Sequence, residues 1–144
     1  MARVPIEPGF FTIPEPGRSP RLLGSRCPGC GEHFFPRRHV CGQCLREGCD
    51  DVLLGPRGRI WTWTYVHVPL FAKKDATVAG YGVGQVDLPE GPRVQGILSG
   101  GPDDFAIGMA VELDLEDLGP DGDGDDVVIF RFRPIDAAVD RAPR

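Results

Sequence analysis

The chain has 144 residues, enough for one domain or for one domain with a small module attached. Its net charge is −5 at pH 7, and the acidic excess lies beyond residue 50, where nine Lys and Arg stand against sixteen Asp and Glu. That half is a poor match to a nucleic-acid backbone, and no apolar run is long enough to span a bilayer. The 20 glycines and 15 prolines predict a β-rich fold with many turns and little helix.

The first 21 residues form a proline-rich arm, which we expect to be extended because proline disfavours helix. The arm carries the apolar residues Ile6, Phe10, Phe11 and Ile13. Two interpretations remain open: a strap packed on its own domain, or an arm that docks on a partner. We see no charged segment followed by an apolar one, so we expect no signal peptide and a cytoplasmic location.

Two Cys-x-x-Cys pairs, Cys27/Cys30 and Cys41/Cys44, are separated by ten residues. Each pair can place two thiolates on one turn, and two facing turns complete a tetrahedral site that suits structural Zn²⁺. A reducing cytosol also favours metal thiolates over disulfides. Two disulfides, four unrelated thiols, or iron in the same geometry are the alternatives. We therefore predict a zinc ribbon over residues 22–50.

The remaining cysteine and the histidines are weaker candidates for chemistry. His33 and His39 lie near the cysteine pairs, but four thiolates already saturate tetrahedral zinc. Cys49 follows the ribbon without partner spacing, so we interpret it as an inert thiol. His67 lies in a strand and is interpreted as a sheet residue. A free-standing enzyme that uses Cys49 or His67 remains a minor alternative.

Strand signals recur from residue 51 to residue 135. They cover 52–54, 60–68, 78–88, 93–99, 111–115 and 127–133, with a short helical turn at 105–109. This amount of antiparallel β-structure is the size of a five-stranded OB-fold barrel. We therefore predict a mainly β fold: a rubredoxin-like zinc ribbon, an OB-fold domain over 51–135 and a C-terminal tail over 136–144.

Two predicted strands each carry a row of unusual residues on one face, an aromatic row and a glycine row. Period-two alternation places Trp61, Trp63, Tyr65 and His67 on one face of 60–68. Gly80, Gly82 and Gly84 share one face of the next strand, where glycine weakens a sheet unless something packs on it. We expect the tryptophan row to cover the glycine row, and keep close approach of a ligand as the alternative.

Several short motifs occur in a fixed order that resembles a known family. They are RCPGCG at 26–31, FPR at 35–37, CGQC at 41–44, GPRGRI at 55–60, TWTY at 62–65, YGVG at 81–84, IGMAVE at 107–112 and FRFRP at 130–134. The chain resembles the acyl-CoA-associated OB-fold family, domain of unknown function 35, which has an N-terminal rubredoxin-like zinc ribbon. The resemblance covers about residues 22–134.

The resemblance implies a function as well as a fold. Such proteins are usually small subunits, or fused domains, of enzymes that handle acyl-CoA thioesters. Their commonest partners belong to the thiolase superfamily, including thiolases and steroid side-chain aldolases, and some accompany hot-dog-fold enoyl-CoA hydratases. The zinc is structural, and the barrel contacts the catalytic subunit near its CoA site. Members often start with a docking helix, which the prolines of residues 5–20 disfavour here.

We therefore expect a non-catalytic accessory subunit in a hetero-oligomer with a thiolase- or aldolase-type partner, whose acyl-CoA it shares. Candidates for the partner surface are Phe10, Phe11, Phe34, Phe35, Arg37 and Arg38. Candidates for contact with CoA phosphates are Lys73, Lys74, Arg93, Arg131 and Arg133, because arginine matches phosphate with a planar fork of donors. The alternative class is a single-stranded nucleic-acid-binding protein in which Trp61, Trp63 and Tyr65 stack on bases.

Overall fold

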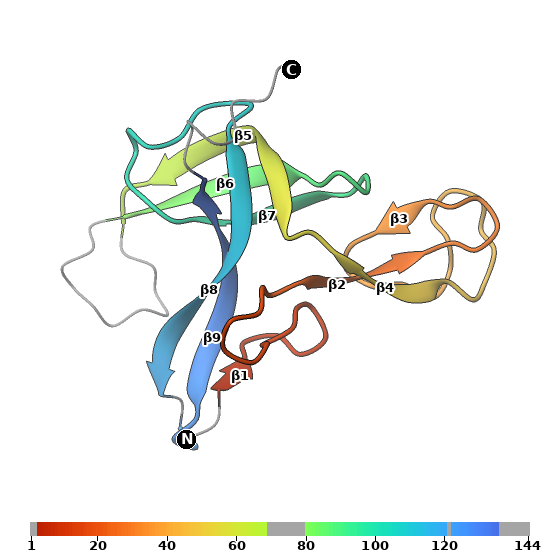
Figure 1. Cartoon of the computed structure of the whole chain (residues 1–144), viewed down its shortest axis with the longest axis horizontal. Helices are drawn as coiled ribbons and strands as arrows, with labels where there is room; N and C mark the ends of the chain where they lie inside the picture. Colours follow the sequence, from red (N-terminus) through yellow and green to blue (C-terminus); the bar gives the residue numbers. More distant parts are fainter. Residues whose placement is uncertain (1–2, 69–79, 121, 136–144) are drawn as a thin grey trace.

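The computed structural model describes residues 3–68, 80–120 and 122–135, and within these ranges the chain forms nine β-strands and no α-helix (Figure 1). The strands are β1 (Arg3–Pro5), β2 (Leu22–Arg26), β3 (His33–Phe34), β4 (Asp50–Leu54), β5 (Arg57–Val66), β6 (Tyr81–Asp87), β7 (Arg93–Leu98), β8 (Ala110–Pro120) and β9 (Asp126–Pro134). The predicted mainly β fold is confirmed. The same described ranges contain no helical segment with the length and hydropathy of a membrane span.

Five strands close a barrel in the order β9-β7-β6-β5-β8, and the pairing of β8 with β9 completes the ring. The pairing of β7 with β9 is parallel, and the other pairings within the ring are antiparallel. This is the five-stranded Greek-key topology of an OB-fold. The predicted helical turn at 105–109 is wrong: the segment is a loop with a turn in which the Met109 N–H donates to the Ala106 carbonyl (3.1 Å).

The barrel interior is filled by side chains that alternate with outward-facing residues along each strand. The fully or almost fully buried members are Ile60, Val86, Val94, Leu98, Val111, Leu113, Val128 and Phe132. Phe105, from the loop before β8, is also buried and belongs to this core. Because an apolar side chain gains about 1.5–3 kcal/mol on full burial, this set supplies the main driving force for the barrel.

A β-bulge in β5 overturns the expected tryptophan row. The register with β6 shifts between Ile60 and Thr62, so Trp61 leaves the alternation and points outward with 48% of its surface exposed. Trp63 remains on the inner side, where its ring meets the Phe105 ring at 5.4 Å. The two tryptophans therefore do not share a face, and Trp61, Trp63 and Tyr65 do not form a common stacking surface.

The glycine row does lie in the barrel wall, but other residues cover it. A Cβ at Gly82 would stand 2.6 Å from the Phe105 ring, and one at Gly84 would stand 2.8 Å from the Leu98 side chain. At Gly80 it would meet the Val66 carbonyl at 2.4 Å. Packing inside the chain therefore explains the absence of side chains at these positions, but the nearest atoms come from Tyr65, Val66, Leu98 and Phe105, so the expected cover by the tryptophan row is wrong.

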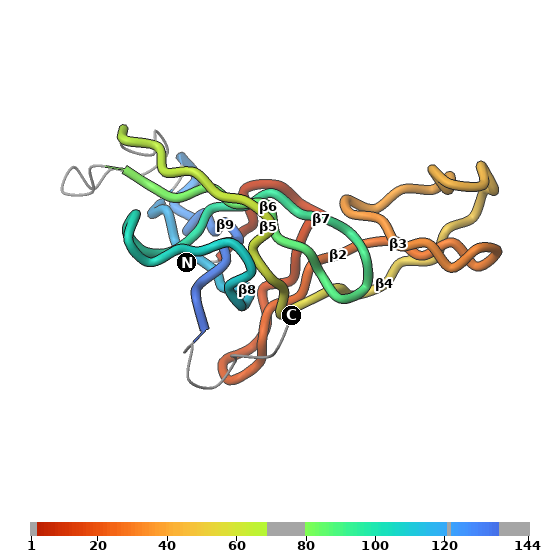
Figure 2. Tube along the Cα trace, turned by 90° about the horizontal axis from the view of Figure 1, so that it is seen from above, coloured from red at the N-terminus to blue at the C-terminus, as the bar shows by residue number. Residues whose placement is uncertain are grey.

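The ribbon is a separate three-stranded antiparallel sheet in the order β3-β2-β4, and it extends away from the barrel (Figures 1 and 2). Ser25 in β2 is fully buried, and its hydroxyl accepts the Arg38 N–H at 2.8 Å. Leu22 and Leu54 lie at the barrel end of this sheet and belong to the main core. The ribbon thus begins in the barrel core and continues outward with few buried side chains.

The N-terminal arm packs on its own chain. Its β1 pairs with β9 in parallel, and the Leu23 N–H donates to the Phe10 carbonyl (2.8 Å) where the arm returns to β2. Phe11 is 4% exposed and forms an isolated antiparallel β-bridge with Leu22. Of the two interpretations of the arm, packing on its own domain is therefore confirmed for these residues.

Candidate metal centre and partner surface

Each Cys-x-x-Cys pair lies on a tight turn closed by backbone hydrogen bonds. The Gly31 N–H donates to the Cys27 carbonyl (2.9 Å), and the Leu45 N–H donates to the Cys41 carbonyl (3.0 Å). The N–H of each first cysteine donates in turn to the carbonyl five residues later, at 2.9 and 2.8 Å. Gly31 and Leu45 both take positive φ angles, +79° and +67°, a region that glycine adopts freely and leucine rarely does.

The two turns bring all four Sγ atoms within 4.8 Å of one another. The Sγ atoms of Cys27 and Cys44 are 3.6 Å apart, as are those of Cys30 and Cys41. A disulfide needs about 2.0 Å, whereas a tetrahedron of Zn–S bonds of about 2.3 Å has edges of about 3.8 Å. The N–H groups of Gln43 and Cys44 donate to the buried Cys41 Sγ, both at 3.3 Å. The predicted site thus fits structural zinc, with all four positions filled by protein.

The protonation of the thiols also indicates that the cluster suits a cation. The Cys30 N–H lowers the pKa of the Cys27 thiol to about 6, although burial acts in the opposite direction. The Glu32 N–H lowers the pKa of Cys30, but burial and the neighbouring thiols together raise it to about 12. One thiolate is therefore favoured while another is opposed by its neighbours. A divalent cation between them removes that repulsion.

The predicted partner residues fall into two groups. Phe10, Phe35 and Phe130 form a chain of edge-on ring contacts at 5.8 and 6.1 Å, which joins arm, ribbon and barrel. Phe11 packs on Phe130 with the ring centres 5.7 Å apart, and its side chain is buried within this chain. The prediction that Phe11 lies on the partner surface is therefore wrong.

Phe34, Arg37 and Arg38 lie on the outer ribbon, the part of the ribbon between Leu22 and Leu54, which themselves belong to the main core. The Arg38 guanidinium lies over the Phe34 ring at 5.0 Å, and Arg37 pairs with Asp51 at 3.3 Å. Their contact with a partner remains a prediction.

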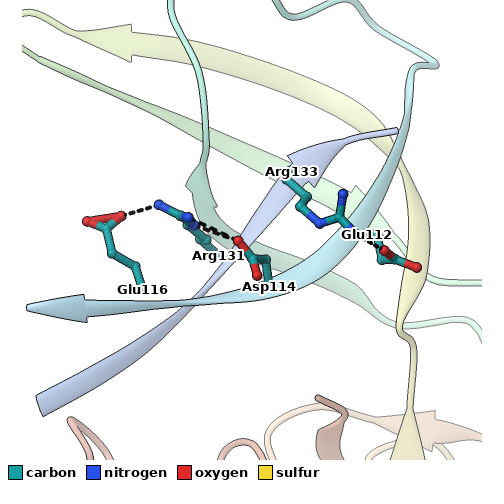
Figure 3. Close-up of polar contacts among 5 residues, drawn as sticks. All are labelled: Glu112, Asp114, Glu116, Arg131 and Arg133. Atoms are coloured by element: carbon teal, nitrogen blue, oxygen red, sulfur yellow. Dashed lines mark hydrogen bonds and ion pairs between the residues drawn. The ribbon is translucent and has the colours of Figure 1, made fainter. Parts of the chain in front are cut away.

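The predicted CoA-binding arginines of β9 project from one sheet face but are paired with carboxylates (Figure 3). The Arg131 guanidinium contacts Asp114 at 3.0 Å and Glu116 at 2.6 Å, and Arg133 pairs with Glu112. Sequence reasoning missed these partners, although residues 112, 114 and 116 show the same period-two spacing as the arginines. The acidic partners leave less positive charge for a phosphate, and phosphate binding here remains a prediction.

Arg93 is likewise engaged within the chain. It donates two hydrogen bonds to Asp87, at 2.6 and 3.2 Å, and its guanidinium lies 3.6 Å from the centre of the Trp61 ring. The bond to Asp87 raises the pKa of Arg93, so its charge is fixed. Lys73 and Lys74 lie outside the described residues.

Cys49 and His67 lack the features of a catalytic pair. Burial raises the pKa of the Cys49 thiol, whereas a nucleophilic cysteine needs a lowered pKa. Cys49 lines a shallow pocket of about 280 Å³ with Arg37, Arg38, His39 and Asp51. His67, predicted as a sheet residue, directly follows the last residue of β5, and its ring lies 5.0 Å from that of Tyr65.

Comparison with known proteins assigns both modules to described families. Residues 14–50 match the model of the ChsH2 rubredoxin-like zinc ribbon domain, and residues 51–116 match that of the ChsH2 C-terminal OB-fold domain. The closing strand β9 lies beyond the matched range and is supplied by the structure.

Two relatives and one solved structure match most of this chain and most of their own length. A DUF35 domain-containing scaffold protein of Methanocaldococcus jannaschii is 37% identical over 80% of this chain and 82% of that protein. The benzoylsuccinyl-CoA thiolase subunit BbsA of Thauera aromatica is 31% identical over 90% of this chain and 88% of that protein. A solved structure of the Ltp2-ChsH2(DUF35) aldolase matches with a TM-score of 0.62 and 30% identity, over 79% of this chain and 84% of that chain. With both modules matched in order along its length, the chain belongs to the DUF35 family of proteins that join a rubredoxin-like zinc ribbon to an OB-fold domain.

Proposed function

We propose that this chain is a non-catalytic accessory subunit that docks on a thiolase-superfamily catalytic subunit and helps to form its acyl-CoA site. The observation that carries the proposal is the similarity, across 90% of the chain, to a protein named as a subunit of benzoylsuccinyl-CoA thiolase. The similarity to the Ltp2-ChsH2(DUF35) aldolase supports a partner of the same class. Thiolases and aldolases both make or break a carbon–carbon bond, so the proposed complex acts on such a bond in a CoA thioester.

The chemistry of the chain favours an accessory role over an independent catalytic one. Four thiol ligands leave tetrahedral zinc no open position for water or substrate, so the metal is suited to holding structure. The spare thiol, Cys49, has a raised pKa and is a poor nucleophile at neutral pH. The reduced thiols suit a cytoplasmic complex, which is part of the proposal.

Two features indicate how the chain acts as a rigid docking unit. The ribbon extends from the barrel, and the ring contacts of Phe10 and Phe35 fix its base against Phe130. A partner can therefore meet ribbon and barrel at once in a set relative orientation, which reduces the entropy lost on binding.

Purification of the tagged full-length chain from its natural cells tests the proposal. We expect a thiolase-superfamily subunit to co-purify in fixed stoichiometry, and carbon–carbon bond formation or cleavage in its CoA thioester to need both subunits. A Cys27→Ser/Cys30→Ser variant should lose the partner, whereas Cys49→Ser should retain it. A chain recovered without such a subunit, together with full activity of the isolated catalytic subunit, would show that the proposal is wrong.

A further inference from the structure

Two arginines of the ribbon pack directly on glycines inside the cysteine turns. The Nε atom of Arg46 lies 2.8 Å from the point where a Cβ of residue 29 would stand, and its Cζ lies at 2.9 Å. Across the site, the Nη1 atom of Arg38 lies 2.8 Å from the corresponding point at Gly42. Any side chain at Gly29 or Gly42 would displace these guanidinium groups. The two glycines therefore let positive charge approach the turns that carry the thiols.

A third arginine, Arg26, lies close to the glycine that follows the first cysteine pair. Arg26 directly precedes Cys27, and its Nη2 atom lies 3.5 Å from the point where a Cβ of residue 31 would stand. Gly31 follows Cys30 and takes a φ of +79°. Gly29 and Gly31 flank Cys30, and Gly42 follows Cys41, so each guanidinium group packs beside a residue that neighbours a ligand cysteine in the chain.

These arginines lack an acidic partner within the described residues, as does Arg21, which donates to the Leu53 and Leu54 carbonyls. Arg3, Arg37, Arg93, Arg131 and Arg133 each pair with a carboxylate. Within residues 3–68, 80–120 and 122–135, no carboxylate lies at ion-pair distance from Arg26, Arg38 or Arg46. Arg38 is held in place by the Phe34 ring and by the Val40 carbonyl, which accepts its Nε–H at 2.7 Å.

The zinc site supplies the missing negative charge. A Zn²⁺ ion bound by four thiolates carries a net charge of −2, and two of its cysteines are exposed at the tip of the ribbon. We infer that Arg26, Arg38 and Arg46 are counter-charges of this metal–thiolate centre and that they raise the affinity of the ribbon for zinc. Outer-shell groups of metal sites typically change affinity by about 10- to 100-fold.

Equilibrium competition with a chromophoric zinc chelator tests the inference on the full-length chain. We expect Arg26→Gln, Arg38→Gln and Arg46→Gln to weaken zinc binding, and the triple variant to weaken it by about 10- to 100-fold. The loss should be larger at low ionic strength, because salt screens exposed charges. The matching lysine substitutions should recover most of the affinity, because they restore the charge.

Arg37→Gln is the matched control, since Arg37 belongs to the same ribbon but pairs with Asp51. It should leave zinc affinity unchanged. Gly29→Ala should weaken binding when Arg46 is present and have no further effect in Arg46→Gln. The tetrahedral d–d spectrum of bound Co²⁺ should persist in every variant, which shows that the four thiolates still assemble. Wild-type affinity in the triple variant, an equal loss in Arg37→Gln, or lysine variants as weak as the glutamine ones would each overturn the inference.

Discussion

The barrel and the outer ribbon differ in what they bury. The barrel encloses a continuous apolar set from all five of its strands, whereas the outer ribbon buries only Ser25, Cys27 and Cys41 among its described side chains. A region with so little apolar surface cannot offset the conformational entropy lost on folding. The ribbon therefore depends on ligand bonds to zinc, and the barrel depends on packing. The predictions below test that division.

The largest effect is expected from removal of a zinc ligand. Cys27→Ser leaves three thiolates and should abolish stable zinc binding, because structural zinc supplies on the order of 10 kcal/mol to such a module. Zinc content should fall, and hydrogen exchange should become fast for amides of β2 and β3 while barrel amides stay protected. Cys49→Ser is the control and should retain zinc. Simultaneous loss of protection in ribbon and barrel would contradict the division between them.

A smaller effect is expected from adding one methyl group inside the barrel wall. In Gly84→Ala the new Cβ would stand 2.8 Å from Leu98, and overpacking of this kind costs about 1–3 kcal/mol. Denaturant unfolding should show the loss while zinc stoichiometry stays unchanged. Leu98→Val in the same chain should recover part of it.

Gly122→Ala is the matched control for this experiment. Nothing lies within 4 Å of its Cβ position, so its unfolding free energy should change by less than about 0.5 kcal/mol. A Gly84→Ala chain as stable as wild type would mean that the glycine row is not closely covered by Leu98.

The difference between the zinc-dependent ribbon and the packing-dependent barrel also explains which features could be predicted from the sequence. Zinc ligation is local: two turns of fixed spacing suffice, so the four cysteines and the ribbon could be named from spacing alone. Most strands could also be placed, because alternation is a property of each segment. The outward position of Trp61 could not be predicted. A one-residue bulge between Ile60 and Thr62 changes which face of the sheet each side chain points to on its two sides, and it leaves no clear mark in the sequence.

Contacts between distant segments were the other limit. The alternation of Arg131 and Arg133 with Phe130 and Phe132 places both arginines on one face. Their partners depend on a register that pairs Arg131 with Asp114 and Arg133 with Glu112. The packing of Arg46 on Gly29 depends on how the second cysteine turn faces the first. Pairings of this kind follow from tertiary structure, and the period-two spacing of residues 112, 114 and 116 was the one local sign of them.

The smallest effect concerns the contact that joins the two regions. Phe35 of the ribbon meets Phe130 of the barrel at 6.1 Å with the rings nearly perpendicular, an arrangement that contributes about 0.5–1.5 kcal/mol beyond area burial. A double-mutant cycle with Phe35→Leu and Phe130→Leu, measured on the zinc-loaded chain by denaturant unfolding, should give a coupling energy in that range. The Phe130→Leu loss should then be smaller when zinc is removed, because an unfolded ribbon no longer holds Phe35 against the barrel. A coupling energy of zero would mean that the ribbon and the barrel are fixed independently, and that a partner, not this seam, sets their orientation.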